Sequence, residues 1–307
     1  MTLQWLFGLT AAMLVTGTAA GQVLRRTARS ESTRATVDNM NERIVAWWAL
    51  CSLAGLALVL GEGAVLAFFA LFSSLALREF VRLTPGRALF PALLLFTALQ
   101  YWAVWRRSTG LFDTLIPAGA ALYIPAHLAV TGYTERFLER AAKVYWGLMV
   151  CTFCLSYAPA LLTLEIRGYA GRNTTLLFYF LLVAQSSDVL QYIWGKLAGR
   201  RPIAPRISPN KTWEGFLGGL LSATALGTAL HGATPFEPWQ AAVACGAVTL
   251  TGFAGGLVFS AVKRGRGVKD FGSLVIGHGG VLDRIDSLCF SAPAFFHLAR
   301  YFCPPGL

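Results

Sequence analysis

Long runs of hydrophobic residues follow one another along this chain, and short polar segments separate them. A helix needs about 17 to 25 mostly apolar residues to cross a bilayer, and most of the runs approach or reach that length. They recur from one end of the sequence to the other, so a single cleaved signal peptide does not account for them. The pattern predicts an all-α, polytopic integral membrane protein.

About ten transmembrane helices are predicted from these runs. Their approximate ranges are 3–23, 44–60, 63–77, 89–105, 111–131, 144–164, 174–195, 215–230, 239–262 and 285–302. The third and eighth are short, which leaves half-spans as an alternative for them. We expect one membrane domain over residues 1–307, with N-terminal helices of unassigned role in 1–173 and catalytic helices and cytoplasmic loops in 174–307.

The Lys and Arg residues support an even number of crossings. Of the 26 in the chain, 21 fall in alternate connections, within residues 25–43, 78–87, 136–143, 196–211 and 263–284. Positive residues favour the cytoplasmic side of a membrane. Both termini are therefore predicted to be extracytoplasmic, and the five basic connections cytoplasmic.

Composition limits the class of partner. The chain is 55% hydrophobic and 13% charged, whereas a soluble domain has roughly a quarter charged residues. The net charge of +11 is dispersed among short loops, so no basic domain is predicted to hold nucleic acid. Anionic lipids and phosphates suit such loops better. The six cysteines lie mostly in apolar segments, and the Cys151 and Cys154 pair has no second ligand pair for zinc.

The segment from Ser260 to Asp286 combines many polar residues between two apolar runs. Glycines surround His278, which lets the backbone bend sharply and present amides to an anion. Asp283 and Asp286 are three residues apart at a helix start, so their carboxylates share a face and suit a hard cation such as Mg²⁺. The alternative is that the basic residues only fix topology and the aspartates only cap the helix.

A second polar loop spans residues 195–215 and contains prolines at 202, 205 and 209. Proline opposes a continuous helix, so this loop is predicted to be an extended, stiffened connection. It could hold Ser208, Lys211 and Thr212 against a phosphate or nucleotide. The alternative is a basic loop that only anchors the protein to anionic lipid.

Asp188 lies well inside the seventh apolar run, where a carboxylate is costly unless it faces a cavity, a cation or a basic partner. It is therefore a candidate functional residue, and a hydrogen-bonded helix contact is the structural alternative. Glu79 lies beside Arg78 and Arg82, and we expect it to form interfacial ion pairs rather than to take part in chemistry.

The residues of the last polar segment resemble the signature of the phosphatidate cytidylyltransferases, also called CDP-diacylglycerol synthases. The matching residues are Ser260, Lys263, Arg264, Lys269, Asp270, Gly272, Gly277, His278, Gly279, Gly280, Asp283, Arg284 and Asp286. The upstream loop is also similar, through Asp188, Tyr192, Gly195, Lys196 and the SPNKTWEG segment at 208–215. One position departs from the family pattern, because Gly256 stands where the family usually has an acidic residue.

The resemblance implies transfer of a cytidylyl group from CTP to phosphatidate, which yields CDP-diacylglycerol and pyrophosphate in phospholipid synthesis. It also implies an active site that faces the cytoplasm at a bacterial inner membrane, and a homodimer. The implied cofactor is Mg²⁺, with or without a second cation. Its predicted ligands are Asp283, Asp286 and Asp188, with Asp270 as an alternative to Asp188.

The same resemblance assigns roles to the other residues. The predicted catalytic set is Lys263, Arg264, Lys269, Asp270, His278 and Arg284, and the predicted substrate-binding set is Ser208, Lys211, Thr212, Ser260, Gly279 and Gly280. Clustered cations neutralise two anions that would otherwise repel each other. His278 is expected to position substrate, with a role as general base as the alternative.

Two other classes of function stay open. A non-catalytic or altered-substrate homologue that binds lipid phosphates is consistent with Gly256. A transporter would also have many helices and an intramembrane Asp, but its polar residues are expected near the middle of the membrane, whereas those of this chain gather at one side.

Overall fold

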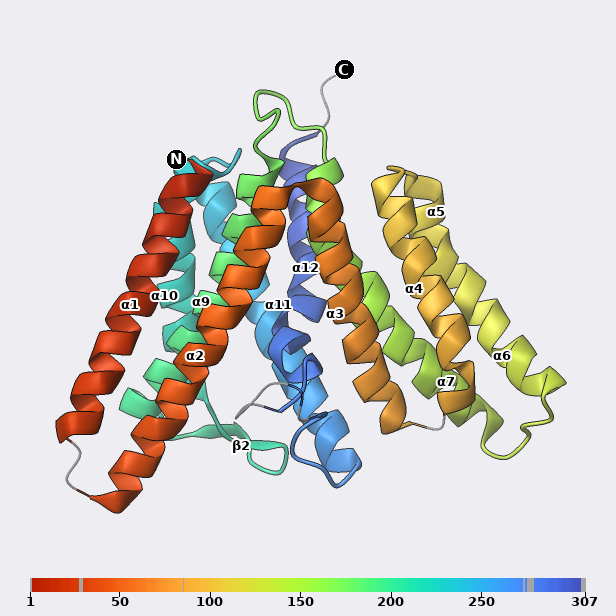
Figure 1. Cartoon of the computed structure of the whole chain (residues 1–307), viewed down its shortest axis with the longest axis horizontal. Coiled ribbons are helices and arrows are strands. Elements are labelled where there is room, and N and C mark those ends of the chain that lie inside the picture. Colours follow the sequence, from red (N-terminus) through yellow and green to blue (C-terminus); the bar gives the residue numbers. More distant parts are fainter. Residues whose placement is uncertain (1, 28–29, 85, 273, 275–278, 305–307) are drawn as a thin grey trace.

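The computed structural model describes residues 2–27, 30–84, 86–272, 274 and 279–304, and nearly all of these lie in helices (Figure 1). Within these described residues, eight long helices are regular throughout: α1 (Leu3–Thr27), α2 (Glu31–Leu60), α3 (Glu62–Arg82), α4 (Phe90–Trp105), α9 (Asn173–Ala198), α10 (Trp213–Ala229), α11 (Pro238–Gly265) and α12 (Leu282–Phe302).

Two further helical segments contain wider or tighter turns. The first joins α5 (Thr109–Thr114), the π-helical η2 (Leu115–Ala120) and α6 (Ala121–Val130). The second joins α7 (Phe137–Leu148), the π-helical η3 (Met149–Cys154), α8 (Leu155–Ala160) and the 3₁₀ turn η4 (Leu161–Thr163). Short 3₁₀ turns η1 (Arg87–Leu89) and η5 (His231–Ala233) lie in connections.

The predicted all-α membrane class is confirmed, although fewer helices qualify as spans than the ten expected. Within the described residues, six helices are long and apolar enough to cross a membrane: Leu3–Thr27, Glu62–Arg82, Thr109–Val130, Phe137–Thr163, Asn173–Ala198 and Pro238–Gly265. The segments Trp47–Leu60 and Phe90–Trp105 are apolar but shorter. The polar first half of α2 and the charged first turns of α12 distinguish these two helices from the six.

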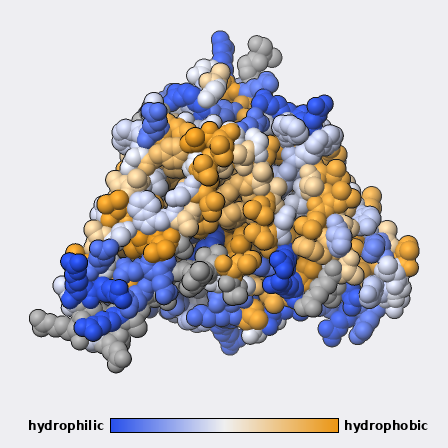
Figure 2. All heavy atoms as spheres, in the orientation of Figure 1, coloured by the Kyte–Doolittle hydropathy of each residue, from blue (hydrophilic) through white to orange (hydrophobic). Residues whose placement is uncertain are grey.

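The surface is arranged as a membrane protein requires. Figure 2 shows hydrophobic residues over the middle of the visible face and hydrophilic residues at its upper and lower edges. Large apolar side chains such as Leu56, Val59, Leu221 and Leu250 are exposed on helix flanks. Contact with lipid tails removes the cost that such side chains would carry in water.

The helices run between two ends of the molecule. The start of α1 and the end of α12 lie at the same end, and the β-hairpin and the connections α1–α2, α3–α4, α6–α7 and α11–α12 lie at the opposite end (Figure 1). These connections contain the basic segments identified in the sequence. We refer to this end as the basic end.

Small residues allow the C-terminal helices to pack closely. A Cβ added at Gly219 of α10 would lie 2.8 Å from the Gln191 Cα of α9. At Gly227 the Tyr179 hydroxyl of α9 donates a hydrogen bond of 2.9 Å to the glycine carbonyl. Close backbone approach at small residues is the usual way in which helices associate within a membrane.

The proline-rich loop is a small β-hairpin rather than only an extended connection. Strand β1 (Pro202–Ala204) pairs antiparallel with β2 (Ser208–Thr212). The hairpin ends at Thr212, whose hydroxyl caps α10 by accepting a hydrogen bond of 3.1 Å from the Gly215 amide. The Glu214 carboxylate accepts hydrogen bonds from the amides of Arg200 and Arg201 and so fixes the entry to β1.

Candidate active site

The first turn of α12 is held by a side chain from a distant helix. Glu79 of α3 is 1% exposed, and its carboxylate accepts hydrogen bonds from the amides of Val281 at 3.0 Å and Leu282 at 2.9 Å. The first amides of a helix have no partner within the helix and carry partial positive charge, so a carboxylate there is stabilising. The expectation that Glu79 only forms interfacial ion pairs is therefore wrong.

Three glycines leave room for the carboxylates of this region. A Cβ at Gly280 would overlap the Glu79 carboxylate, and one at Gly272 would lie 2.6 Å from its Oε1. Gly279 has φ +84°, which side chains rarely adopt, and a Cβ there would lie 2.9 Å from Asp283 Oδ2. Gly279 and Gly280, predicted as substrate contacts, thus have a steric role in the fold of the site.

Asp283 organises the loop before α12. Its Oδ1 accepts a bond of 2.6 Å from Lys263 Nζ, and its Oδ2 accepts bonds of 2.9 Å from the amides of Phe271 and Gly280. The side chains of Asp283 and Lys263 are only 4% and 13% exposed. Both oxygens of this carboxylate are already used by the protein.

Asp188 and Asp286 are joined by one residue. The Ser287 amide donates a hydrogen bond of 2.8 Å to Asp286 Oδ1, and the Ser287 hydroxyl donates one of 2.8 Å to Asp188 Oδ2. The fold therefore places Asp188 of α9 beside Asp286 of α12, although the two residues are 98 positions apart in the sequence. Two neighbouring carboxylates repel each other unless cations lie nearby.

Lys211 of β2 supplies such a cation at the position where the sequence departs from the family pattern. Its Nζ lies 2.5 Å from where a Cβ would stand on Gly256, and Asp286 Oδ2 lies 3.7 Å from the same point. The ammonium also lies over the Phe253 ring, at 4.8 Å from the centroid. Burial lowers the pKa of Lys211, while the carboxylates of Asp286 and Asp188 oppose that shift.

The predicted metal ligands do not all meet. Among the residues that the structure describes, no three His, Cys, Asp or Glu side chains converge as a ligand group. Asp188 and Asp286 lie together, whereas Asp283 is directed to Lys263 and the loop amides. The donor set therefore fits a cation held by two carboxylates, with further oxygens supplied by water or substrate phosphates, as Mg²⁺ prefers.

The other predicted catalytic residues have varied environments. The Arg264 guanidinium donates hydrogen bonds to the carbonyls of Ile207 at 3.3 Å and Val268 at 3.2 Å, which ties the hairpin loop to the end of α11. Lys269 and Asp270 are exposed, and Arg284 is half-buried in the first turn of α12. His278 lies outside the described residues.

Two predicted substrate-binding hydroxyls are engaged locally. Thr212 caps α10, and the Ser260 hydroxyl donates a hydrogen bond of 2.6 Å to the Gly256 carbonyl one turn earlier in α11. Ser208 begins β2 and is half-buried. Of the predicted substrate-binding set, Lys211 is the residue that the fold brings directly beside Asp286.

These features define a class of protein: a membrane-embedded helical protein with carboxylates and lysines clustered at the basic end of its helices. The chain matches the cytidylyltransferase family over residues 41–302 and belongs to that family.

Several curated relatives support this assignment. The chain is 37% identical over 266 residues to the protein named uncharacterized protein YnbB of Escherichia coli K12, covering 85% of this chain and 87% of that protein. It is 40% identical over 221 residues to a phosphatidate cytidylyltransferase of Brucella abortus, covering 69% and 77%. It is 44% identical over 158 residues to one of Mycobacterium leprae, covering 50% of this chain and 47% of that protein. The chain thus spans about half the length of the last of these.

Proposed function

We propose that this protein transfers a cytidylyl group from CTP to phosphatidate and releases pyrophosphate. The observation that carries the proposal is that Asp286 and Lys211 meet at Gly256, while Ser287 joins Asp188 to Asp286. The Lys263–Asp283 pair lies on the same α11 and α12 helices. A lipid head group and a soluble nucleotide can both reach the ends of membrane helices. The relatives of Brucella abortus and Mycobacterium leprae that are named phosphatidate cytidylyltransferases support the same reaction.

In this reaction a phosphate oxygen of phosphatidate forms a bond to the α-phosphorus of CTP, and the bond from that phosphorus to the β-phosphate oxygen breaks. Both reactants are anions, so the main task of the site is to offset their repulsion and align them. Lys211 makes no ion pair within the described part of the chain, which leaves its charge available to a phosphate. Lys263 is already paired with Asp283, so its role is to fix the loop beside the nucleotide.

Asp188 and Asp286 would hold the divalent cation, and Mg²⁺ bound by them would supply positive charge to the phosphates of CTP. Asp283 takes a different role from the one predicted, because its two oxygens hold Lys263 and two loop amides. The residues that bind the cation in this proposal are therefore Asp188 and Asp286. Lys269, Asp270 and Arg284 remain candidates for contacts with the triphosphate or the lipid phosphate.

We also propose that the helices cross the membrane ten times and that the basic end faces the cytoplasm of a bacterial inner membrane. The excess of Lys and Arg in the connections at that end supports this orientation. CTP is a cytoplasmic nucleotide, so in this orientation the proposed site would open to the compartment that contains CTP. The homodimer implied by the family resemblance stays a prediction.

The test is conversion of labelled CTP and phosphatidate to CDP-diacylglycerol by the purified protein in the presence of Mg²⁺. Asp286→Asn should lower the rate by roughly a hundredfold or more, because the site loses a cation ligand. Asp113→Asn is the matched control, since Asp113 is exposed on α5 away from the site. The proposal fails if the folded protein is inactive with CTP and phosphatidate, or if Asp286→Asn is as active as the original protein.

A second candidate function is a lipid-phosphate-binding homologue that does not transfer the nucleotide. Gly256 favours it, because the Lys211 ammonium takes up the space next to a position that is usually acidic in the family. Such a protein would bind phosphatidate but form no CDP-diacylglycerol from CTP. Measuring lipid binding and turnover on the same preparation separates the two functions.

A further inference from the structure

A pocket opens at the basic end, and its lining differs from the residues of the candidate active site. It has a volume of about 670 Å³ and lies between the ends of α3 and α6, the start of α7 and the end of α11. Pockets that hold small ligands usually measure about 300 to 1,000 Å³. None of Asp188, Lys211, Lys263 or Asp286 lines it.

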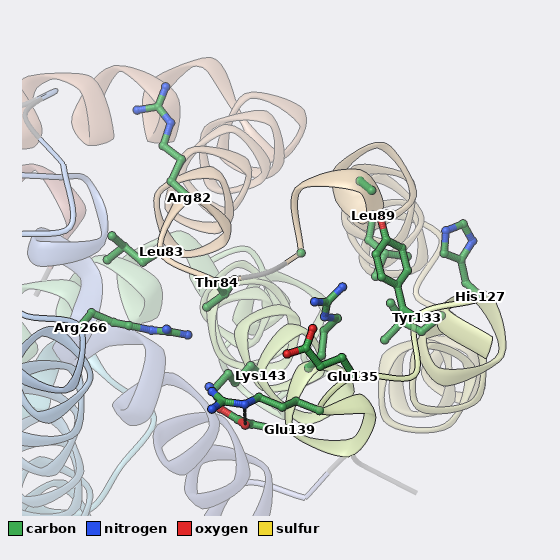
Figure 3. A pocket seen from close by; sticks show the side chains of 15 residues that line it. Arg82, Leu83, Thr84, Leu89, His127, Tyr133, Glu135, Glu139, Lys143 and Arg266 are labelled. Atoms are coloured by element: carbon green, nitrogen blue, oxygen red, sulfur yellow. Dashed lines mark hydrogen bonds and ion pairs between the residues drawn. The ribbon is translucent and has the colours of Figure 1, made fainter. Parts of the chain in front are cut away.

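Its lining carries an excess of positive charge. The cations are Arg82, Arg136, Arg140, Lys143 and Arg266, against two glutamates at 135 and 139. Figure 3 shows Lys143 and Glu139 side by side on α7, with Arg266 projecting towards the pocket from α11.

The glutamates offset only part of this charge. Glu139 pairs with Lys143 and, at 3.9 Å, with Arg136. The Arg140 guanidinium lies over the Tyr133 ring, at 4.6 Å from its centroid. Arg266 forms no ion pair with any residue in the described ranges. The pocket therefore keeps guanidinium groups that suit a phosphate, which they bind through paired hydrogen bonds.

Apart from Thr84 and His127, the rest of the lining is mostly apolar, and the pocket lies at the level where the helices end. Leu83, Leu89 and Leu128 contribute aliphatic surface, and Tyr133 contributes an aromatic ring. Basic side chains together with apolar ones, at the ends of helices that span a membrane, match a lipid head group with its first chain carbons. We propose that this pocket binds the phosphate group of an anionic lipid head group, as a site separate from the one that handles CTP. This inference does not depend on the proposed enzymatic activity.

Binding can be followed by the rise in the thermal unfolding temperature of the detergent-solubilised full chain. The probe is dihexanoyl-phosphatidylglycerol, whose phosphodiester is not the phosphomonoester that the proposed reaction uses. Dihexanoyl-phosphatidylcholine tests whether net negative charge is needed, and inorganic phosphate tests whether the lipid part is needed. A ligand that binds only the folded state raises its stability in proportion to the logarithm of its concentration over its Kd.

The variants are Arg140→Gln and Arg266→Gln, and the control is Arg26→Gln, an exposed arginine at the end of α1. We expect each pocket variant to weaken binding of the phosphatidylglycerol about fivefold, and the control to leave it unchanged. Inorganic phosphate should bind more weakly than the lipid, with the same loss in the pocket variants.

Three outcomes would overturn the proposal. One is binding of phosphatidylcholine as tight as that of phosphatidylglycerol. Another is an equal loss of binding in Arg26→Gln, which would show that the pocket variants weaken binding only by lowering the net charge of the protein. The third is inorganic phosphate that binds as tightly as the lipid, which would assign the pocket to a soluble anion. Loss of CDP-diacylglycerol synthesis alone does not bear on these measurements.

Discussion

The carboxylate of Glu79 occupies the space that a side chain at position 280 would need. It reaches from α3 to the first turn of α12 and accepts hydrogen bonds from the amides of Val281 and Leu282, while Gly280 lies against it without a Cβ. The absence of a side chain at Gly280 is therefore what allows Glu79 to reach the start of α12.

Gly280→Ala should destabilise the protein by about 1 to 3 kcal/mol, because the new methyl group overlaps the Glu79 carboxylate and the neighbouring backbone must shift. The measurement is unfolding by heat or denaturant in detergent. Gly265→Ala is the matched control, since a Cβ at Gly265 meets no atom within 4 Å. Equal effects of the two substitutions would contradict this account of the contact.

Glu79→Gln keeps the shape of the side chain but replaces one acceptor oxygen by an amide donor. One of the two α12 amides then loses its partner and the favourable charge at the helix start is lost, so we expect a destabilisation of about 1 to 3 kcal/mol. The rate of CDP-diacylglycerol formation should fall as well, because the first turn carries Asp283 and precedes Asp286. Glu62→Gln, in the half-buried first turn of the same helix, removes only an ion pair with Arg107 at the surface, so it should leave the rate unchanged and lower stability by less than about 1 kcal/mol. A stable and fully active Glu79→Gln protein would show that the carboxylate does not position α12.

The Lys263–Asp283 pair should show strong energetic coupling. Lys263→Met or Asp283→Asn alone leaves a buried group without its partner, which we expect to cost about 3 kcal/mol. In a double-mutant cycle the two changes together should cost clearly less than their sum. The exposed pair Arg25–Asp38, with side chains 65% and 44% exposed, is the comparison and should show a coupling below about 1 kcal/mol. A coupling that is equally small in both pairs would rule out a buried ion pair at the site.

Gly256→Asp should give a folded protein, because the atom in the way is the flexible end of Lys211, which can move and pair with the new carboxylate. The new acid would lie beside Asp286 and add a third carboxylate to the proposed cation site. We expect half-maximal activity at a lower Mg²⁺ concentration, measured with saturating CTP and phosphatidate. Gly256→Asn controls for the added volume. If Gly256→Asp and Gly256→Asn behave alike, Lys211 and the two native aspartates form the complete site without a further acid.

Thr212→Asn distinguishes the two roles of this residue. Asparagine is as good a helix cap as threonine, so the stability of the hairpin and α10 should be retained. If Thr212 acts only as the cap, the KM for CTP should be unchanged, whereas Thr212→Ala should lose about 1 kcal/mol of stability. If the KM for CTP rises in Thr212→Asn while stability stays normal, Thr212 contacts the substrate as predicted.

Hydrophobic runs predicted the apolar part of each long helix, because burial in a membrane imposes a length and an apolar composition on it. They did not predict the polar first parts of α2 and α7. The start of α12 could also be predicted, since Asp283 lies in its first turn as expected. The prolines at 202, 205 and 209 indicated that the loop at 195–215 is not a continuous helix. Its pairing as a hairpin could not be predicted, because it depends on contacts between the two strands.

The long-range contacts of the site could not be predicted. Glu79 and Leu282 are separated by 203 positions, and a single glutamate among arginines has the same local pattern whether it faces solvent or a helix end. The departure at Gly256 was visible in the sequence, but the ammonium of Lys211 beside it depends on how β2 packs against α11. Asp188 and Asp286 were both singled out, yet the Ser287 bridge between them appears only in three dimensions.

The attachment of α12 to α3 bears on how the chain can be divided. Every residue of the family signature lies after position 187, so a fragment of residues 174–307 would contain all of them. That fragment would lack Glu79, and the first two amides of its last helix would lose the partner that they have in the whole chain. The N-terminal helices are thus a structural part of the site, and the two portions of the chain are expected to work only when both are present, whether on one polypeptide or as two that associate.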